Sequence, residues 1–253
     1  MEKTLSGKTA LISGSCSGIG AAIARELASR GANIVINYPF ANFKSQAEAM
    51  VASLSTKAIA VEADISTTTG PENLISEAVA EFNQVDILVN NAALAINLPL
   101  EEQTLADWDK LVNLNCRGTF LLTKAVLPHL TKTDSRIVNI DSISARAAPP
   151  MQTIYAGTKG MVDSFTRVWA KELPRKYGCT VNAVSPGPTA TEGFADAGEE
   201  FVKQIQPIVD RTPVSPRMAR PEEIAFAVGF LCEPRASWIN GLNLVASGGL
   251  HID

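Results

Sequence analysis

The stretch KTALISGSCSGIGAAIARELASRG, residues 8–31, decides which fold the sequence predicts. Its first residues form a continuous apolar run typical of a strand buried on both faces, and residues 18–31 have the apolar spacing of a helix. Gly14, Gly18 and Gly20 mark the turn between them. Glycine lets a backbone approach a pyrophosphate closely, and the following helix N-terminus offers free N–H groups. We therefore expect a dinucleotide to bind at this turn.

The same alternation of strand and helix continues along the rest of the chain. Further strands are expected at 33–37, 58–64, 85–91, 136–141, 180–185 and 242–247, and helices at 43–54, 71–83, 104–116, 152–176 and 221–231. Strands this rich in Val, Ile and Leu belong to parallel sheets that are covered by helices. The predicted fold class is α/β, a doubly wound sheet of seven parallel strands with helices on both faces. No linker or repeat interrupts it, so we expect residues 1–253 to form one domain.

The composition excludes several classes of function. The 253 residues are 46% hydrophobic and 19% charged, with a net charge of −4 and no basic run, so neither nucleic acid nor an anionic membrane is an expected partner. The apolar stretches are too short to cross a membrane, and the N-terminus lacks the layout of a secretory signal. Four scattered cysteines and two distant histidines predict free thiols in a reducing compartment, no metal site and a cytoplasmic protein.

One region breaks the alternation. From about Pro186 to Arg220 the sequence is rich in Pro, Thr and Gly, with a short helix expected at 198–210. Because a long excursion in a compact domain is usually functional, we expect a substrate lid at about 188–212.

The segment IYAGTKGMVDSF, residues 154–165, places Tyr155 and Lys159 one helical turn apart. Side chains at positions i and i+4 of a helix are neighbours, and a nearby ammonium group favours phenolate over phenol. We therefore expect Lys159 to lower the Tyr155 pKa from its usual value of about 10, so that the tyrosine can act as a general acid or base. The alternative is a tyrosine at the edge of the core beside a solvated lysine.

Further motifs follow in a set order, and with the G-x-x-x-G-x-G spacing they resemble the short-chain dehydrogenase/reductase family over nearly the whole chain. The motifs are SGSCSGIG (13–20), Asp64 in EADI, NNAA (90–93), Asn115 in NLNCRG, Ser142 in IVNIDS, Tyr155 with Lys159, and SPGPTAT (185–191). The resemblance is strongest to the 3-oxoacyl-carrier-protein reductase and polyketide or naphthol reductase branch, and it implies a Rossmann fold.

The resemblance implies four catalytic residues, namely Asn115, Ser142, Tyr155 and Lys159. Hydride transfer to a carbonyl carbon leaves negative charge on oxygen, so a positioned acid must supply a proton, and Tyr155 is the candidate. Ser142 follows a strand at the sheet edge where such folds bind ligands, and its hydroxyl can hold the carbonyl oxygen. By resemblance, Lys159 also binds the nicotinamide ribose, and Asn115 holds a water molecule in a proton relay to Lys159. The alternatives are a backbone-capping serine and a helix kink at Asn115.

The resemblance also implies the cofactor contacts. The expected cofactor-binding residues are Gly14, Ser17, Gly18, Ile19, Gly20, Tyr38, Asp64, Ile65, Asn90, Tyr155, Lys159, Pro186, Gly187, Thr189 and Thr191. Among them, Asp64 would contact adenine, although it can also be an ordinary turn residue, and Asn90 would face the adenosine through its backbone. Asn91 would brace the sheet.

The end of the second strand indicates which nicotinamide is preferred. An acidic residue there would bind the ribose 2′-OH and select NAD, but Tyr38 occupies that position. Lys44 and Ser45 open the next helix, where an anion is favoured. We therefore expect NADP(H) rather than NAD(H), although Ser17 stands where many NADP-binding relatives carry a basic residue.

Three residues depart from the family pattern. Ala93 replaces a glycine and could narrow the pocket, Asp141 replaces the serine that usually precedes Ser142, and Ser247 replaces an acidic residue. We expect Asp141 to alter the local electrostatics. Apart from Arg146, the expected substrate loops, 144–151 and 188–212, carry no strong cationic cluster.

The leading functional hypothesis is an NADPH-dependent reductase that converts a medium-sized, fairly apolar ketone to a secondary alcohol. A dehydrogenase that oxidises an alcohol, polyol or steroid is an alternative, and a cofactor-binding regulator without catalysis is a remote one. Helices 104–127 and 152–176 carry excess apolar residues, including Met161, Val162, Phe165, Val168 and Trp169. With the resemblance, they predict a homo-oligomer, either a tetramer or a dimer.

Overall fold

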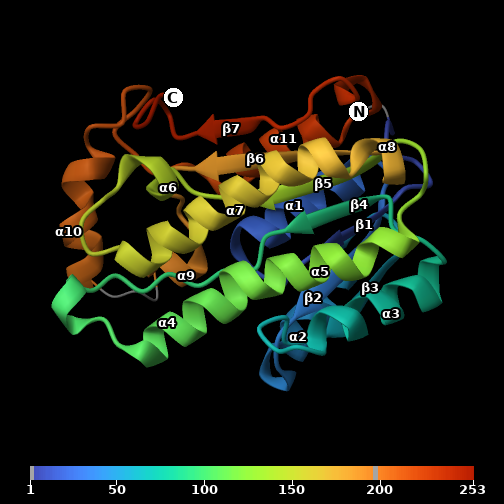
Figure 1. Ribbon diagram of the computed structural model, residues 1–253, viewed down its shortest axis with the longest axis horizontal. Helices are drawn as coiled ribbons and strands as arrows, with labels where there is room; N and C mark the ends of the chain where they lie inside the picture. Colours follow the sequence, from blue (N-terminus) through green and yellow to red (C-terminus); the bar gives the residue numbers. More distant parts are fainter. Residues whose placement is uncertain (1–2, 196–198) are drawn as a thin grey trace.

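The computed structural model describes residues 3–195 and 199–253 of the chain (Figure 1). The strands are β1 (Thr9–Ile12), β2 (Asn33–Tyr38), β3 (Ala58–Glu62), β4 (Ile87–Asn90), β5 (Ser135–Ile140), β6 (Cys179–Pro186) and β7 (Asn243–Ala246). The α-helices are α1 (Gly18–Ser29), α2 (Lys44–Ser53), α3 (Gly70–Phe82), α4 (Leu105–Leu111), α5 (Thr119–Val126), α6 (Ser144–Ala147), α7 (Thr153–Glu172), α8 (Pro174–Tyr177), α9 (Glu192–Ala195), α10 (Glu199–Val209) and α11 (Pro221–Cys232). Short 3₁₀ turns are η1 (Ala41–Phe43), η2 (Leu100–Glu102), η4 (Leu127–His129) and η5 (Pro234–Ala236), and η3 (Val112–Gly118) is a π-helical segment.

The strands form one sheet in the order β3-β2-β1-β4-β5-β6-β7, and every pair is parallel. The chain winds outward from β1 in one direction and then from β4 in the other. The reversal lies between β1 and β4, where Ile12 pairs with Val89. Ligands of open α/β sheets bind at the carboxyl ends of the strands beside such a reversal. The predicted doubly wound α/β sheet is therefore confirmed.

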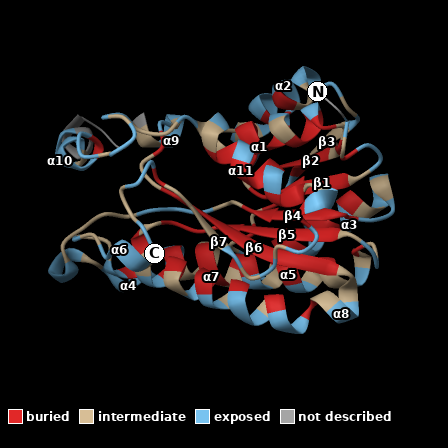
Figure 2. Ribbon diagram, turned by 90° about the horizontal axis from the view of Figure 1, so that it is seen from above, coloured by how far each residue is buried: buried red, intermediate tan, exposed pale blue. Residues whose placement is uncertain are grey.

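Helices cover both faces of the sheet and enclose two apolar cores. One core joins the sheet to α1, α2 and α11, and the other joins it to α3, α5 and α7. Figure 2 shows the buried strands between α1 and α11 on one side and α5 and α7 on the other. Because the strands are covered on both faces, they need the continuous apolar runs from which they were predicted.

The helix expected at 104–116 extends further and changes its winding. It begins at Leu105, after a capping box in which Thr104 and Asp107 satisfy each other's backbone N–H groups. Its middle is the π-helical segment η3, and it continues as α5 to Val126. The sequence prediction missed this widened turn, which contains Asn115. Single π-turns inside α-helices occur often at functional sites.

The helix expected at 152–176 is interrupted near its end. Helix α7 ends at Glu172, and the four-residue α8 begins at Pro174, whose missing N–H cannot continue the ladder. Helix α8 ends at Tyr177, and Gly178, which follows it, has a φ of +64°. Among the described residues, no helix is both long and apolar enough to cross a membrane.

The excursion after β6 contains two helices. The helix expected at 198–210 is present as α10, and α9 precedes it without having been predicted. Residues 196–198, which belong to the predicted lid, lie outside the described residues. Figure 2 shows α9 and α10 beyond the carboxyl ends of the strands. The predicted lid therefore lies at the end of the sheet where a ligand is expected.

Candidate active site

The glycine turn between β1 and α1 has the conformation that its sequence predicts. Gly14 and Gly18 have φ values of +61° and +55°, in the left-handed region that favours glycine. A Cβ atom on Gly14 would lie 2.9 Å from that of Ala92, and one on Gly20 would lie 2.6 Å from Asn91 Nδ2. At Gly14 and Gly20, the turn therefore has no room for a side chain.

Hydrogen bonds from neighbouring strands hold this turn in place. Asn91 Nδ2 donates to the carbonyl oxygens of Ser13 and Gly14, both at 2.9 Å, and so braces the turn against the end of β4. Asn37 Oδ1 accepts a hydrogen bond from the Gly14 N–H at 2.9 Å, while its Nδ2 donates to the Ala63 carbonyl oxygen at 3.0 Å. Sequence reasoning missed Asn37. The feature of the sequence that could have indicated Asn37 is a polar residue inside the otherwise apolar strand NIVINY.

The first turn of α1 offers an anion site that fits a dinucleotide pyrophosphate. Ser17 precedes the helix but makes no capping hydrogen bond with its side chain, and the first turn contains no acidic residue. The N–H groups of this turn therefore remain available at the positive end of the helix dipole. A Cβ atom on Gly18 would lie 3.4 Å from Thr191 Cγ2, so the segment after β6 passes over the turn. This arrangement brings Ser17, Gly18, Ile19 and Gly20 together with Thr191.

The expected adenosine side lies along the ends of β2, β3 and β4. Tyr38 ends β2 and is buried, and α2 begins at Lys44 as expected. Asp64 Oδ1 accepts a hydrogen bond from the Ser66 N–H at 2.9 Å, so Asp64 does have the turn role that the sequence left open. The Asn90 side chain donates to Thr123 and Asn139, while buried Ile65 lies next to Asp64 in the chain. Contacts of these residues with adenine remain predictions.

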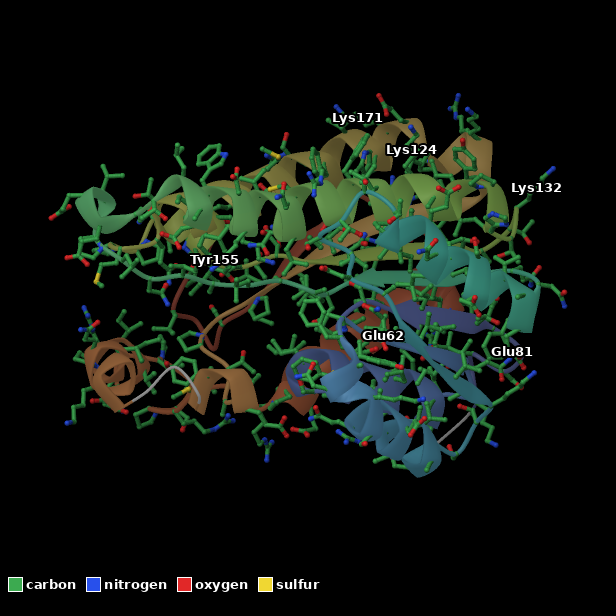
Figure 3. All side chains as sticks on the ribbon, turned by 90° about the horizontal axis from the view of Figure 1, so that it is seen from below. Glu62, Glu81, Lys124, Lys132, Tyr155 and Lys171 are labelled. Atoms are coloured by element: carbon green, nitrogen blue, oxygen red, sulfur yellow. The ribbon has the colours of Figure 1, made fainter. Side chains whose placement is uncertain are left out.

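Three of the four expected catalytic side chains meet at the carboxyl ends of β5 and β6. Ser142 follows β5, and Tyr155 and Lys159 lie on α7. Lys159 Nζ donates to the Ile140 carbonyl oxygen at 2.7 Å and lies 5.9 Å from the centroid of the Tyr155 ring. The side chain of Ser142 lowers the Tyr155 pKa, so the two polar groups lie near each other. Figure 3 shows Tyr155 towards the segment that carries α9 and α10, with Lys132 and Glu81 at the opposite end of the molecule.

The fourth residue, Asn115, links the π-helical segment to α7. Its Nδ2 donates to the Leu94 carbonyl oxygen at 2.9 Å and to Thr158 Oγ1 at 3.0 Å, and its Oδ1 accepts from the Leu94 N–H at 2.9 Å. Thr158 Oγ1 in turn donates to the Tyr155 carbonyl oxygen at 2.7 Å. Both amide hydrogens of Asn115 are thus used to hold the loop after β4 against α7. The water relay that the resemblance implies remains a prediction.

The Tyr155 pKa differs from the sequence prediction. The Tyr155 side chain is half-buried, and its desolvation raises the pKa to about 12, while Ser142 opposes the increase and the charge of Asp141 adds to it. The ammonium group of Lys159 donates its hydrogen bond to the Ile140 carbonyl oxygen. Burial lowers the pKa of Lys159, and the electrostatic effects of Asp141 and Cys116 oppose that decrease. The expectation that Lys159 lowers the Tyr155 pKa in the protein alone is therefore wrong, because desolvation of the phenolate dominates.

Arg146, the cationic group noted in the expected substrate loops, is paired within the protein. Its guanidinium contacts both carboxylate oxygens of Asp163 at 3.1 Å and also pairs with Asp253 near the C-terminus. Ser247, another departure from the family pattern, hydrogen-bonds with the backbone of His251 at 3.2 Å, and Ala93 is exposed. The positive charge of Arg146 is therefore balanced without a substrate.

The chain is similar to known proteins over nearly its whole length. The enoyl-(acyl carrier protein) reductase family matches residues 14–251. The short-chain dehydrogenase/reductase FrzI of Cladobotryum sp. is 40% identical over 247 residues, which cover 96% of this chain and 95% of the relative. The hydroxynaphthalene reductase arp2 of Aspergillus fumigatus is 35% identical over 248 residues, covering 94% and 90%.

A solved structure shows the same similarity in three dimensions. The crystal structure of a blue fluorescent protein from a metagenomic library, in complex with NADPH, superposes with a TM-score of 0.90. It is 33% identical in sequence, and the match covers 98% of this chain and 100% of that one.

Proposed function

Because the chain belongs to the short-chain dehydrogenase/reductase family, and is therefore an NAD(P)-dependent oxidoreductase, we propose that it reduces a ketone to a secondary alcohol with NADPH. The observation that carries the proposal is the grouping of Ser142, Tyr155 and Lys159 at the sheet edge where the glycine turn also lies. The proposed catalytic residues are these three and Asn115.

The residues of this chain divide the proposed reaction among them. When bound, the nicotinamide supplies the hydride that the carbonyl carbon receives. Ser142 donates a hydrogen bond to the carbonyl oxygen, where negative charge develops, and Tyr155 donates its phenolic proton to the same oxygen. Lys159 positions the tyrosine by its hydrogen bond to the Ile140 carbonyl oxygen, which holds α7 against β5. Asn115 positions the tyrosine through Thr158, which donates to the Tyr155 carbonyl oxygen. The product is the alcohol, and Tyr155 regains its proton from solvent.

Tyr155 carries the proton that the reductive direction requires. Its pKa is raised from the ordinary value, so the residue is a phenol at neutral pH, which is the form that can donate a proton to a carbonyl oxygen. The presence of all four side chains also argues against a regulator without catalysis.

Two features support NADPH and a neutral substrate. The strand β2 ends in Tyr38 rather than an acid, so no carboxylate repels a 2′-phosphate there, and the metagenomic relative binds NADPH. Arg146 is already paired with Asp163 and Asp253, which favours a substrate without a carboxylate or phosphate. Since a hydroxynaphthalene reductase is among the relatives, ketones of hydroxylated fused-ring aromatics are the first substrates to test.

The test is a ketone screen followed by two matched variants. Consumption of NADPH identifies the substrate, and Tyr155→Phe should then reduce turnover about 10²–10⁴-fold, because it removes only the general acid. Tyr177→Phe is the control, since Tyr177 ends α8 at the other end of the molecule. NADPH affinity should remain nearly intact in Tyr155→Phe, because the variant keeps the ring and loses only the hydroxyl, and it should not change in Tyr177→Phe. Wild-type turnover in Tyr155→Phe would disprove the assignment of the acid.

A further inference from the structure

Asp141 is a buried carboxylate between β5 and Ser142, where the family usually has serine. It is 2% exposed. Its Oδ2 accepts hydrogen bonds from Asn243 Nδ2 at 3.0 Å and from Ser185 Oγ at 3.4 Å, whereas its Oδ1 is buried and has no hydrogen-bond partner. A buried carboxylate satisfied on one oxygen only costs free energy, so its presence here calls for a functional explanation.

The charge of Asp141 is not neutralised by a direct ion pair. Among the residues that the structure describes, no cationic nitrogen lies within 4.0 Å of its carboxylate. The neighbouring acid differs: Asp163 pairs with Arg146 at 3.1 Å and with Arg167 at 2.7 Å. Asn243 Nδ2 donates to both acids and so joins them.

Asp141 is placed to act on the proposed catalytic pair. Lys159 Nζ donates to the carbonyl oxygen of Ile140, the residue just before Asp141, and Ser142, just after it, interacts with Tyr155. Asp141 is thus joined in the chain to both groups that contact the pair, and its carboxylate lies in the protein interior, where charges are poorly screened.

We propose that Asp141 is a positioning residue for the proposed reduction: its buried carboxylate holds protons on the Tyr155–Lys159 pair and so keeps the site ready to protonate a carbonyl oxygen. The inference rests on the proposed function, because it assigns Asp141 a role in the same site. No direct contact of Asp141 with the substrate or the cofactor is required.

The electrostatic effects support this role. The charged and titratable side chains that face Asp141 or Lys159 are Tyr155, Lys159 and Asp163 on α7, Arg146 on α6 and Cys116 in η3. Burial raises the pKa of the Cys116 thiol to about 11 and so keeps it uncharged. Desolvation raises the pKa of Tyr155 and the negative charge of Asp141 adds to that increase, whereas burial lowers the pKa of Lys159 and the charge of Asp141 opposes that decrease. Removing that negative charge should let the pair lose its first proton at lower pH, whichever member gives it up.

The experiment compares the pH dependence of kcat/KM in the wild type, Asp141→Asn and Asp141→Ser. We expect the alkaline decline of NADPH-dependent reduction to move down by about one pH unit or more in both variants. The difference should diminish as the pH falls through about 6, because burial raises the pKa of Asp141 to about 6 and the wild-type carboxyl takes up its proton over that range. Asp141→Ser restores the residue usual in the family, so it provides a second variant if Asp141→Asn does not fold.

Asp86→Asn is the matched control. Asp86 is also a buried carboxylate, 1% exposed, but it lies at the amino ends of the strands, where it accepts hydrogen bonds from the Thr9 N–H at 2.8 Å and from Lys8. Its replacement should lower stability without moving the pH profile. A purely structural role for Asp141 would make its variants behave in the same way.

A second readout does not depend on turnover. The chain has three tyrosines, so ¹³C-labelling at Cζ gives three NMR signals, and Tyr155→Phe assigns the one of interest. At a given alkaline pH, the Tyr155 signal should show more phenolate in the Asp141 variants. If no ketone is reduced but this signal changes, the proposed function fails and the role of Asp141 stands. Unchanged pH profiles, or an unchanged tyrosine signal where turnover is absent, would overturn the inference.

Discussion

Tyr38 is the residue on which the cofactor preference depends. It is 5% exposed and packs in the core at the end of β2, where an acid would select NAD. We expect Tyr38→Asp to weaken NADPH binding at least tenfold, about 1.4 kcal/mol, because a carboxylate would repel the 2′-phosphate. Fluorescence titration with NADPH and NADH measures the change.

Tyr38→Asn separates charge from packing in that experiment. Asparagine has nearly the size of aspartate, so both variants lose the same core contacts, and only the aspartate should shift the preference towards NADH. Equal NADPH-to-NADH ratios in the two variants, or an NADH preference in the wild type, would contradict the interpretation.

At the scale of residues, the sequence predicted which side chains form the site but not their electrostatic state. The i, i+4 spacing of Tyr155 and Lys159 and the strand-end position of Ser142 are local features, and a sequence displays them directly. The desolvation of half-buried Tyr155 and the pairing of Arg146 with Asp253 depend on segments far apart in the chain. The pKa direction was wrong for that reason, since desolvation arises only after packing.

At the scale of elements, the tightest constraint lies where α1 starts. A methyl group on Gly20 would lie 2.6 Å from Asn91 Nδ2 and 2.9 Å from Ser15 Cα, so Gly20→Ala must displace the turn. We expect this variant to lose about 1–3 kcal/mol of stability and most of its NADPH affinity. Denaturant unfolding and NADPH titration measure both effects.

Gly157 provides the control for that prediction. It lies inside α7, and a Cβ atom there would meet no other atom within 4 Å. Gly157→Ala should therefore stabilise the protein by about 0.5–1 kcal/mol through its better helix propensity, with NADPH affinity unchanged. Wild-type NADPH affinity in Gly20→Ala would show that the turn is not the cofactor cradle.

The elements that the sequence predicted well are those with strong periodicity. All seven strands and the longer helices between them were found, whereas the four-residue helices α6 and α9 were not. The strands were found because buried parallel strands are continuous apolar runs. The π-helical segment η3 was missed, since its widening depends on contacts made by Asn115 and by Gly118, where a Cβ atom would lie 2.7 Å from the Ile65 carbonyl oxygen. Such contacts have no periodic signal.

At the scale of the whole molecule, the parallel sheet brings site residues from distant parts of the chain, Gly14 to Thr191, to the carboxyl ends of its strands. We propose that residues 1–253 form one domain and that 188–212 acts as its lid, since this segment already touches the glycine turn through Thr191. Gln46 of α2 also donates to Glu192 at 3.3 Å, which ties the start of the segment to the expected adenosine side. Closure would exclude water from the site.

The outer surface of the molecule predicts self-association. Phe120 on α5 and Met161 and Val168 on α7 are 43%, 44% and 47% exposed, and Phe165 and Trp169 stack beside them with ring centroids 5.0 Å apart. Val162, which the sequence suggested for this surface, is instead buried in the protein. On the opposite face, Phe226 and Phe230 of α11 are 63% and 43% exposed, close in sequence to Trp238, which is 98% exposed.

Two apolar surfaces on opposite faces of one chain favour a tetramer with two kinds of two-fold contact. We therefore expect light scattering at micromolar concentration to give a tetramer for the wild type. Val168→Lys on α7 and Phe226→Lys on α11 should each leave dimers, because each places a charge in only one of the two contacts, and the double variant should be a monomer. Val214→Lys is the control, since Val214 is 77% exposed but lies on neither helix. A monomeric wild type would refute self-association. A dimeric wild type that becomes monomeric in one of the two single variants would show that self-association uses only the interface carrying that substitution.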